Sequence, residues 1–448
     1  MTTKSNPVPE RALTGSLRDF RSPHGSDLIG RVAGFYEWQN LRREHDLWPY
    51  ARSTSTAPQA RCEARSDTGA AFSGINFASQ DYLSLSSHPA IKATAIKAIE
   101  AFGVHSAGSA ALLGNTANSL LLEQGLSEFL GGREIVLYPT GWAAGYGSVQ
   151  GFVRANDHIV MDILAHSCLQ EGAKAATTNI HYHSHLNLDA MTRKLERIRA
   201  TDHENGILVV TESLFSMHSD TPDLMAMRAL CDTYGATLLV DCAHDLGSMG
   251  DDGLGHLGKQ NAMAAADIII GSFSKTFASN GGFIAVRNRA TAEYLKYYSA
   301  THTFSNALSP VQAATVLCAL NIVRSEEGRL LRRKLMDNIV YLREQMTKAG
   351  LEVLGDPSPI VPVSLGLEGV GRFASRQLMA MGGIANLVEY PAVPQGAARF
   401  RFQVMASHTR DDIDQVVSIL AKAMRDADVE YRAGHQGEVA TGRHPANV

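Results

Sequence analysis

Short apolar runs alternate with helix-length segments between about residues 90 and 290. Strands that alternate with helices predict a mostly parallel sheet with helices on both faces, so the fold class is α/β. In such sheets, ligands bind at the carboxyl ends of the strands. The predicted strands are EIVLY (134–138), HIVMD (158–162), GILVVTES (206–213), ATLLVDCAH (236–244), ADIIIGSFS (266–274) and GGFIAV (281–286).

The segments on either side predict further domains. Residues 1–26 are rich in Pro, Ser, Arg and Gly, which is typical of a mobile arm, and residues 27–46 have helical periodicity. A long helical stretch runs from Pro310 to Ala349, and two strand-like runs follow it, VLGDPSPIVPVSL and AARFRFQV. The predicted divisions are an N-terminal arm and helix (1–73), a large cofactor-binding domain (74–307), a small α+β C-terminal domain (308–432) and a disordered tail (433–448).

Composition narrows the class of protein. The chain has 448 residues and a formal net charge of −4, which does not favour nucleic acid or an anionic membrane as a partner. Its apolar runs are far shorter than the roughly 20 residues that span a bilayer, and no secretory apolar segment opens the sequence. Five scattered cysteines without CxxC spacing predict neither disulfides nor zinc, so we expect a cytoplasmic protein.

A lysine follows one of the buried strands, in GSFSKTF (271–277). Desolvation at such a place lowers the pKa of an amine and makes it a nucleophile toward an aldehyde. The hydroxyls around Lys275, from Ser272, Ser274 and Thr276, suit a phosphate. Taken alone, Lys275 is more often an exposed loop lysine.

A carboxylate ends the neighbouring apolar run, in LLVDCAH (238–244). Burying an ionised Asp241 without a partner is costly, and a protonated pyridine nitrogen is such a partner. His244 is placed to hydrogen-bond the phenolic oxygen of the same ring. Alone, Asp241 could be a helix N-cap. Together with Lys275, it predicts pyridoxal 5'-phosphate held as a Schiff base on Lys275.

Two other motifs are weaker. YPTGWAAGYG (138–147) follows a strand and predicts a helix start that presents backbone N–H groups to a phosphate. Its glycines give GxGxxxG rather than GxGxxG, so it is poor support for NAD. His181, His183 and His185 would share one face of a strand and could bind a metal, but no carboxylate or cysteine has matching spacing. We therefore predict no metal site.

Nine motifs occur in the order in which one known family has them. The chain resembles the α-oxoamine synthases, which are fold-type-I pyridoxal-phosphate enzymes and include 2-amino-3-oxobutyrate CoA ligase, 8-amino-7-oxononanoate synthase, 5-aminolevulinate synthase, serine palmitoyltransferase and quorum-sensing autoinducer synthases. The resemblance covers about residues 74–425. The motifs are NFASQDYLSLSSHP, HSAGSAALLGN, PTGWAA, LAHSCLQEGA, TESLFSMHSD, VDCAHDLG, GSFSKTF, FSNALSP and ARFRFQVMASHT.

The resemblance implies a role for each matching residue. Lys275 would hold the cofactor and then move a proton at the substrate α-carbon, and Arg401 would bind the substrate carboxylate. Gln80 replaces the asparagine that often helps to hold that carboxylate. The other implied cofactor contacts are Asp241 to the pyridinium nitrogen, His244 to the ring hydroxyl, His166 stacked on the ring, Ser216 near the ring oxygen, Gly141, Trp142 and Ser272 at the phosphate, and Ser305 at the phosphate of the neighbouring subunit of a homodimer.

The implied reaction joins an amino acid to an acyl thioester, delivered by CoA or an acyl carrier protein, and usually releases CO2 to give an α-aminoketone. Departures from the family pattern surround the substrate: Gln80, and HSAGSA (105–110) in place of a motif with an arginine. An aminotransferase or aldol-type lyase on the same fold is therefore an alternative. A second alternative is a scaffold subunit that binds no cofactor, but such subunits typically lack the lysine found here at position 275.

Overall fold

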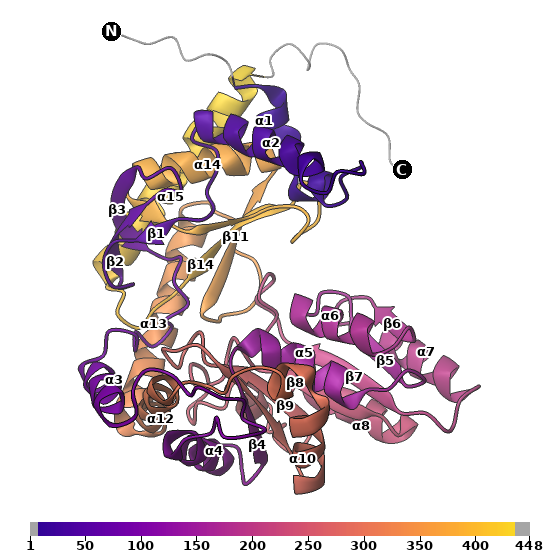
Figure 1. Ribbon diagram of the computed structural model, residues 1–448. Helices are drawn as coiled ribbons and strands as arrows, with labels where there is room; N and C mark the ends of the chain where they lie inside the picture. The colour runs from indigo at the N-terminus through magenta and orange to yellow at the C-terminus, as the bar shows by residue number, and fades with distance from the viewer. Residues whose placement is uncertain (1–7, 435–448) are drawn as a thin grey trace. The chain divides into compact units, whose positions relative to one another are not determined.

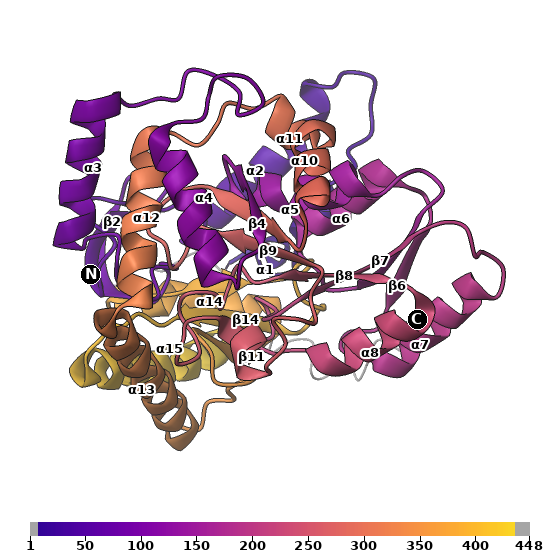
Figure 2. The ribbon, with the colours of Figure 1, turned by 90° about the horizontal axis from the view of Figure 1, so that it is seen from below.

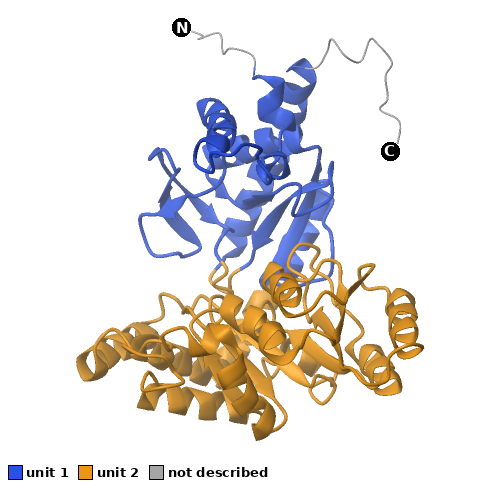
Figure 3. Cartoon of the chain, turned by 45° about the vertical axis from the view of Figure 1, so that its right-hand side comes forward, with its two compact units in different colours: residues 1–79, 338–404, 408–448 blue, residues 80–337, 405–407 orange. Residues whose placement is uncertain are grey.

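The computed structural model describes residues 8–434, which form two compact units (Figures 1 and 3). The larger unit contains residues 80–337 and 405–407, and the smaller contains the described residues up to 79, residues 338–404 and those from 408. This division differs from the predicted domains, because the segment 308–337 belongs to the larger unit and the N-terminal segment to the smaller. Most of the predicted disordered tail, residues 435–448, lies outside the described residues.

The larger unit is built on a seven-stranded sheet, in the order β4-β10-β9-β8-β7-β5-β6. Strands β5 to β9 are parallel, and only β10 runs antiparallel to its neighbours. The predicted mostly parallel sheet is thus confirmed. Its strands are β4 (Glu134–Tyr138), β5 (His158–Asp162), β6 (Ile180–His183), β7 (Ile207–Glu212), β8 (Thr237–Asp241), β9 (Ile268–Ser272) and β10 (Gly282–Val286).

Helices bury both faces of this sheet. On β8, neighbouring residues Leu239 and Val240 point to opposite faces, and both are completely buried. Helices α3, α12 and α4 pack side by side (Figure 2). The helices of the unit are α3 (Pro89–Phe102), α4 (Ala117–Phe129), α5 (Gly141–Phe152), α6 (Ser167–Ala176), α7 (Leu188–Arg199), α8 (Leu224–Tyr234), α9 (Gly255–Lys259), α10 (Arg289–Tyr298), α11 (Ala300–Thr303) and α12 (Pro310–Arg324).

The smaller unit has two sheets, ordered β1-β2-β3-β12 and β11-β14-β13. The long helical stretch predicted from Pro310 is two helices, because Ser325 is extended and separates α12 from α13 (Glu326–Lys348). The elements of this unit are α1 (Glu10–Thr14), η1 (Leu17–Phe20), η2 (Gly30–Val32), α2 (Ala33–Glu44), β1 (Ser53–Thr54), β2 (Arg61–Arg65), β3 (Ala71–Asn76), β11 (Ile360–Gly366), α14 (Glu368–Ala380), β12 (Gly383–Ile384), β13 (Asn386–Val388), β14 (Ala398–Gln403) and α15 (Arg410–Gly434).

The N-terminal segment is ordered, contrary to the prediction of a mobile arm, which is wrong for residues 8–26. Ala12 and Leu13 are buried. The guanidinium of Arg372 donates to the carbonyl oxygens of Ala12 and Gly15, at 2.9 and 2.6 Å. A long-range contact of this kind leaves no trace in the local composition, which is why the prediction failed.

The same arginine belongs to a buried ionic cluster. Glu389 accepts hydrogen bonds from Arg372 Nε at 2.5 Å, Arg42 Nη2 at 3.3 Å and the Tyr50 hydroxyl at 2.7 Å. Burial by itself raises the pKa of the Glu389 carboxyl, but Arg42 and Arg372 outweigh it and hold that pKa below its usual value. The cluster therefore exists as one carboxylate between two guanidinium groups.

We expect Glu389→Gln to lower the free energy of unfolding by about 3–5 kcal/mol, because removing one partner leaves buried cations uncompensated. Urea denaturation checks this value. Glu430→Gln is the matched control, since it removes a half-buried ion pair with Arg376 near the surface of the same unit and should cost only about 1 kcal/mol. Equal losses for the two variants would contradict a special role for the buried cluster.

Candidate active site

Asp241 and Lys275 lie at the carboxyl ends of two neighbouring strands. Asp241 is the last residue of β8 and is paired in register with Ile270 of β9, which ends three residues before Lys275. Burial raises the pKa of the Asp241 carboxyl, and the positive charges of His166 and Lys275 partly offset this rise. The structure therefore brings these three predicted residues together. A buried carboxylate with a raised pKa fits a cationic partner such as a pyridinium.

The predicted phosphate-binding residues also meet. Helix α5 begins at Gly141, where Thr140 Oγ1 accepts the N–H of Ala143 and leaves the first N–H groups of the helix for an anion. A Cβ atom on Gly141 would lie 2.4 Å from Ser272 Oγ, so only glycine allows this approach. Trp142 is half-exposed, and its ring stacks on Tyr146.

A hydroxyl beside Lys275 supports the same site. Thr276 is buried, and its Oγ1 has no hydrogen-bond partner within residues 8–434. An orphaned buried hydroxyl costs free energy unless a ligand satisfies it. A polar ligand bound next to Lys275 would satisfy it.

The ring of His244 is hydrogen-bonded to a buried tyrosine. Its Nδ1 lies 3.0 Å from the hydroxyl of Tyr82, a side chain with no exposed surface. The sequence drew attention to the Gln80–Ser84 motif but gave Tyr82 no role. A tyrosine 162 residues away along the chain offers no local sign that it orients a histidine.

His166 is the N-cap of α6, and its backbone N–H donates to Glu212 Oε1 at 2.7 Å. Its Nδ1 accepts the N–H of Cys168, so a neutral His166 has its proton on Nε2. Glu212 ends β7 and pairs in register with Asp241. Burial raises the pKa of Glu212, and the neighbouring Asp241 raises it further. Sequence reasoning missed Glu212, although a carboxylate ending a buried strand is the signal that identified Asp241.

Four predicted site residues remain, and the structure gives the place of each along the fold. Ser216 is buried in the loop after β7, Ser305 is half-buried in the loop between α11 and α12, and Gln80 is half-buried at the start of the larger unit. Arg401 lies on β14 of the smaller unit, between Pro362 and Asn386 of the flanking strands. The roles predicted for these four residues stay predictions.

The three histidines of the possible metal site do not converge. His181 on β6 contacts His158, whereas His185 lies beyond the end of β6 and contacts Asp162 and Asp220. The predicted common face is wrong, because the strand ends at His183. In the part of the chain that the structure describes, no group of three or more His, Cys, Asp or Glu side chains could hold a metal ion.

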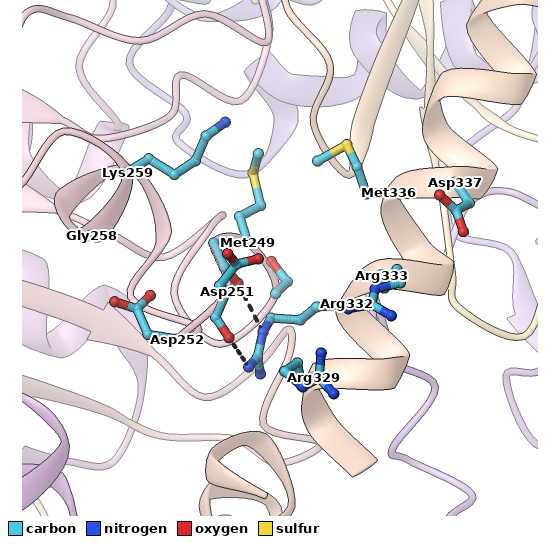
Figure 4. Close-up of a pocket in the computed structure, with 12 residues that line it drawn as sticks. Met249, Asp251, Asp252, Gly258, Lys259, Arg329, Arg332, Arg333, Met336 and Asp337 are labelled. Atoms are coloured by element: carbon cyan, nitrogen blue, oxygen red, sulfur yellow. Dashed lines mark hydrogen bonds between the residues drawn. The ribbon is translucent and has the colours of Figure 1, made fainter. Parts of the chain in front are cut away.

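A cavity of about 690 Å³ opens elsewhere in the larger unit, and none of the predicted site residues lines it (Figure 4). Arg332 forms one wall and donates to the carbonyl oxygens of Gly250, Val323 and Asp251, at 2.9, 2.7 and 2.6 Å. Lysine, arginine and aspartate side chains share the lining, so its charges largely cancel. The cavity is therefore distinct from the cluster around Lys275.

The helices from residue 8 to residue 434 include none long and apolar enough to cross a membrane. All five cysteines are unpaired. The cytoplasmic location expected from the sequence stays a prediction.

Comparison with known proteins agrees with this geometry. The aminotransferase class I and II family matches residues 73–420. The bipyrrole-methanol synthase PigH of Serratia sp. is 29% identical over 98% of this chain and 67% of its own length. The serine palmitoyltransferase of Sphingobacterium spiritivorum is 31% identical over 82% of this chain and 92% of its own. A solved serine palmitoyltransferase variant from S. paucimobilis, with a bound PLP–myriocin aldimine, has a TM-score of 0.84 at 24% identity and covers 90% of this chain and all of that one.

The fold is that of the fold-type-I pyridoxal-phosphate enzymes. Within it, the chain belongs to the α-oxoamine synthase family, as the nine motifs predicted. Members of this family depend on pyridoxal 5'-phosphate, and the residues present fit that cofactor: Lys275, the buried carboxylate of Asp241, and an orphaned hydroxyl on Thr276.

We expect Gly141→Ala to weaken the binding of pyridoxal phosphate at least tenfold, because the new methyl group would displace Ser272 from the start of α5. Titration of the apoenzyme with cofactor, followed by absorbance, measures the change. Gly34→Ala adds the same methyl group to α2 where nothing lies within 4 Å, and should bind the cofactor as the wild type does. Wild-type affinity in Gly141→Ala would place the phosphate elsewhere.

Proposed function

We propose that this protein condenses an amino acid with an acyl thioester and releases the thiol and, usually, CO2, to give an α-aminoketone. The observation that supports this most is the grouping of Lys275, Asp241 and His166 at one end of the sheet, in a chain that belongs to the α-oxoamine synthases. The names of the two relatives refer to different products, so the family alone does not select the substrates.

Each residue contributes a separate part of the chemistry. Bound pyridoxal phosphate supplies a ring that accepts electrons from the substrate α-carbon. Asp241, as a buried carboxylate, keeps the ring nitrogen protonated, and Lys275 takes the α-proton and later returns a proton. The ring of His166 orients the substrate, and its backbone is fixed by Glu212.

The substrate carboxylate would pair with Arg401. A guanidinium makes two parallel hydrogen bonds to a carboxylate, and this geometry sets the orientation of the α-carbon. Gln80 would add an amide donor. Whether CoA or an acyl carrier protein delivers the acyl group is decided by the thioester assay below.

We also infer a homodimer. Leu112, Leu113 and Phe304 are 87%, 91% and 86% exposed in the single chain. They lie on two loops that are held together by a bridge between Ser109 and Asn306. Contiguous apolar side chains that are this exposed mark an interaction surface. Ser305 follows Phe304 directly, so the same surface would bring Ser305 to the neighbouring subunit.

Leu113→Glu should therefore convert the dimer to a monomer, because it places a charge on the apolar surface. Light scattering after size exclusion measures the mass. Val429→Glu, which alters an exposed apolar residue of α15, should leave the dimer intact. A Leu113→Glu variant that is still dimeric would place the interface elsewhere.

The function is tested by titrating the holoenzyme with the twenty amino acids and following the visible absorption of the cofactor. Acyl-CoA and acyl carrier protein thioesters are then added separately, and thiol release is measured. We expect one or two amino acids to shift the spectrum and thiol release to depend on them, with Lys275→Ala inactive. Bleaching by keto acids without thiol release would instead support the aminotransferase alternative.

A further inference from the structure

His185 lies between two carboxylates. Its Nδ1 is 3.0 Å from both oxygens of Asp162, and its Nε2 is 3.0 Å from Oδ2 of Asp220. Asp162 is almost completely buried, and the other oxygen of Asp220, Oδ1, is buried with no hydrogen-bond partner within residues 8–434. Each ring nitrogen of His185 therefore faces an acceptor.

This arrangement requires a charged ring. A neutral imidazole has a single N–H and could donate to only one carboxylate, while its other nitrogen would face the second with a lone pair. An imidazolium donates from both nitrogens and neutralises charge that would otherwise be buried. Asp162, His185 and Asp220 thus form an ionic bridge, which we call the His185 clamp.

The clamp joins two loops of the larger unit. Asp162 ends β5, and its carboxylate also accepts the N–H groups of Leu164 and Leu186 at 2.9 Å. The loop that it starts leads directly to His166.

Asp220 closes the second loop, because its carbonyl oxygen accepts the N–H of Phe215 at 2.9 Å. That loop contains Ser216, and the ring of Phe215 packs against the edge of His185, with ring centroids 4.6 Å apart. The two loops therefore hold two residues predicted to contact the cofactor, and His185 is bonded to an acid at the start of one loop and at the end of the other.

We propose that His185 is a positioning residue that stays protonated at neutral pH and fixes the loops bearing His166 and Ser216. The proposal rests on the proposed function only for what those two residues do. The bridge itself is a property of the three side chains. His185 is not a catalytic residue, because it acts through the two loops.

The groups around the ring determine when the clamp is lost. Asp162 and Asp220 face its two nitrogens, and the ring of His218 lies 5.3 Å away. Partial burial lowers the pKa of His185, but the two carboxylates outweigh it and raise the pKa to about 9. With this raised pKa, His185 in the folded protein is charged at neutral pH. The stability that the clamp contributes is fully present below the ordinary histidine pKa of about 6.5 and is lost as the pH rises through 9.

Hydrogen exchange of the holoenzyme tests the clamp without any substrate. At pH 7.5, His185→Gln should exchange about tenfold faster than wild type in segments 163–170 and 213–221, because a neutral amide cannot neutralise the charge of the two carboxylates. The control His181→Gln, in a histidine of the adjacent strand, should match wild type. At pH 10 the difference between His185→Gln and wild type should vanish, since wild-type His185 is then neutral. No difference at pH 7.5, or one that persists at pH 10, would overturn the proposal.

A second variant keeps the shape and reduces the charge. Asp220→Asn retains an oxygen acceptor for His185, so the fold is preserved, but it removes one carboxylate that raises the pKa of His185. We expect near wild-type kcat at pH 7 and an alkaline loss of activity that begins about one pH unit lower than in wild type. His185→Gln should lower kcat about tenfold or more with little change in KM for the acyl thioester.

An unshifted pH profile in Asp220→Asn would contradict the charge-based role. If no condensation is found even in wild type, the proposed function fails, and hydrogen exchange still decides whether the clamp exists. The two failures are therefore distinguishable.

Discussion

The burial of carboxylates at the carboxyl ends of adjacent strands is the constraint on which this site depends. Glu212 and Asp241 are neighbours in the sheet, and both are almost completely buried. Two such groups repel each other and resist ionisation unless positive charge is supplied. The loop beyond β9 supplies it through Lys275, and the cofactor ring would add more. The site is thus an arrangement that offsets the cost of two carboxylates in an apolar sheet.

The same pattern recurs at the next strand. Asp162 ends β5 as Asp241 ends β8, and it too is neutralised from a neighbouring loop, by His185. Three strands of the sheet therefore end in buried acids, each with a different partner. Asp241 faces the cofactor residues, Glu212 binds a backbone N–H, and Asp162 binds a histidine ring and two backbone N–H groups. Of the three acids, only Asp241 is predicted to contact the cofactor, whereas Glu212 and Asp162 fix the loops around it.

Sequence reasoning succeeded where the signal is local. Apolar runs predicted six of the seven strands of the large sheet, all except β6, and a charge that follows such a run identified Asp241 and Lys275. It failed where the two partners of a contact are far apart along the chain. Examples are the hydrogen bond of Tyr82 to His244 and that of Arg372 to the N-terminal segment. Ser325 could not be recognised as a break between two helices, because serine is common in helices and only its extended backbone ends α12. Glu212 was missed although its signal was present and it lies in the motif TESLFSMHSD, because only Ser216 of that motif was given a role.

Because both ring nitrogens of His185 are hydrogen-bonded to carboxylates, this residue also changes the number of protons that the folded molecule binds. The formal charge of −4 counts every histidine as neutral, so a charged His185 makes it −3. In an unfolded chain near pH 8 this imidazole would be mostly neutral, whereas in the folded protein its pKa is about 9. Folding near pH 8 therefore takes up about one proton from the buffer at His185. The heat of folding measured by calorimetry then includes the ionisation enthalpy of whichever buffer donates that proton.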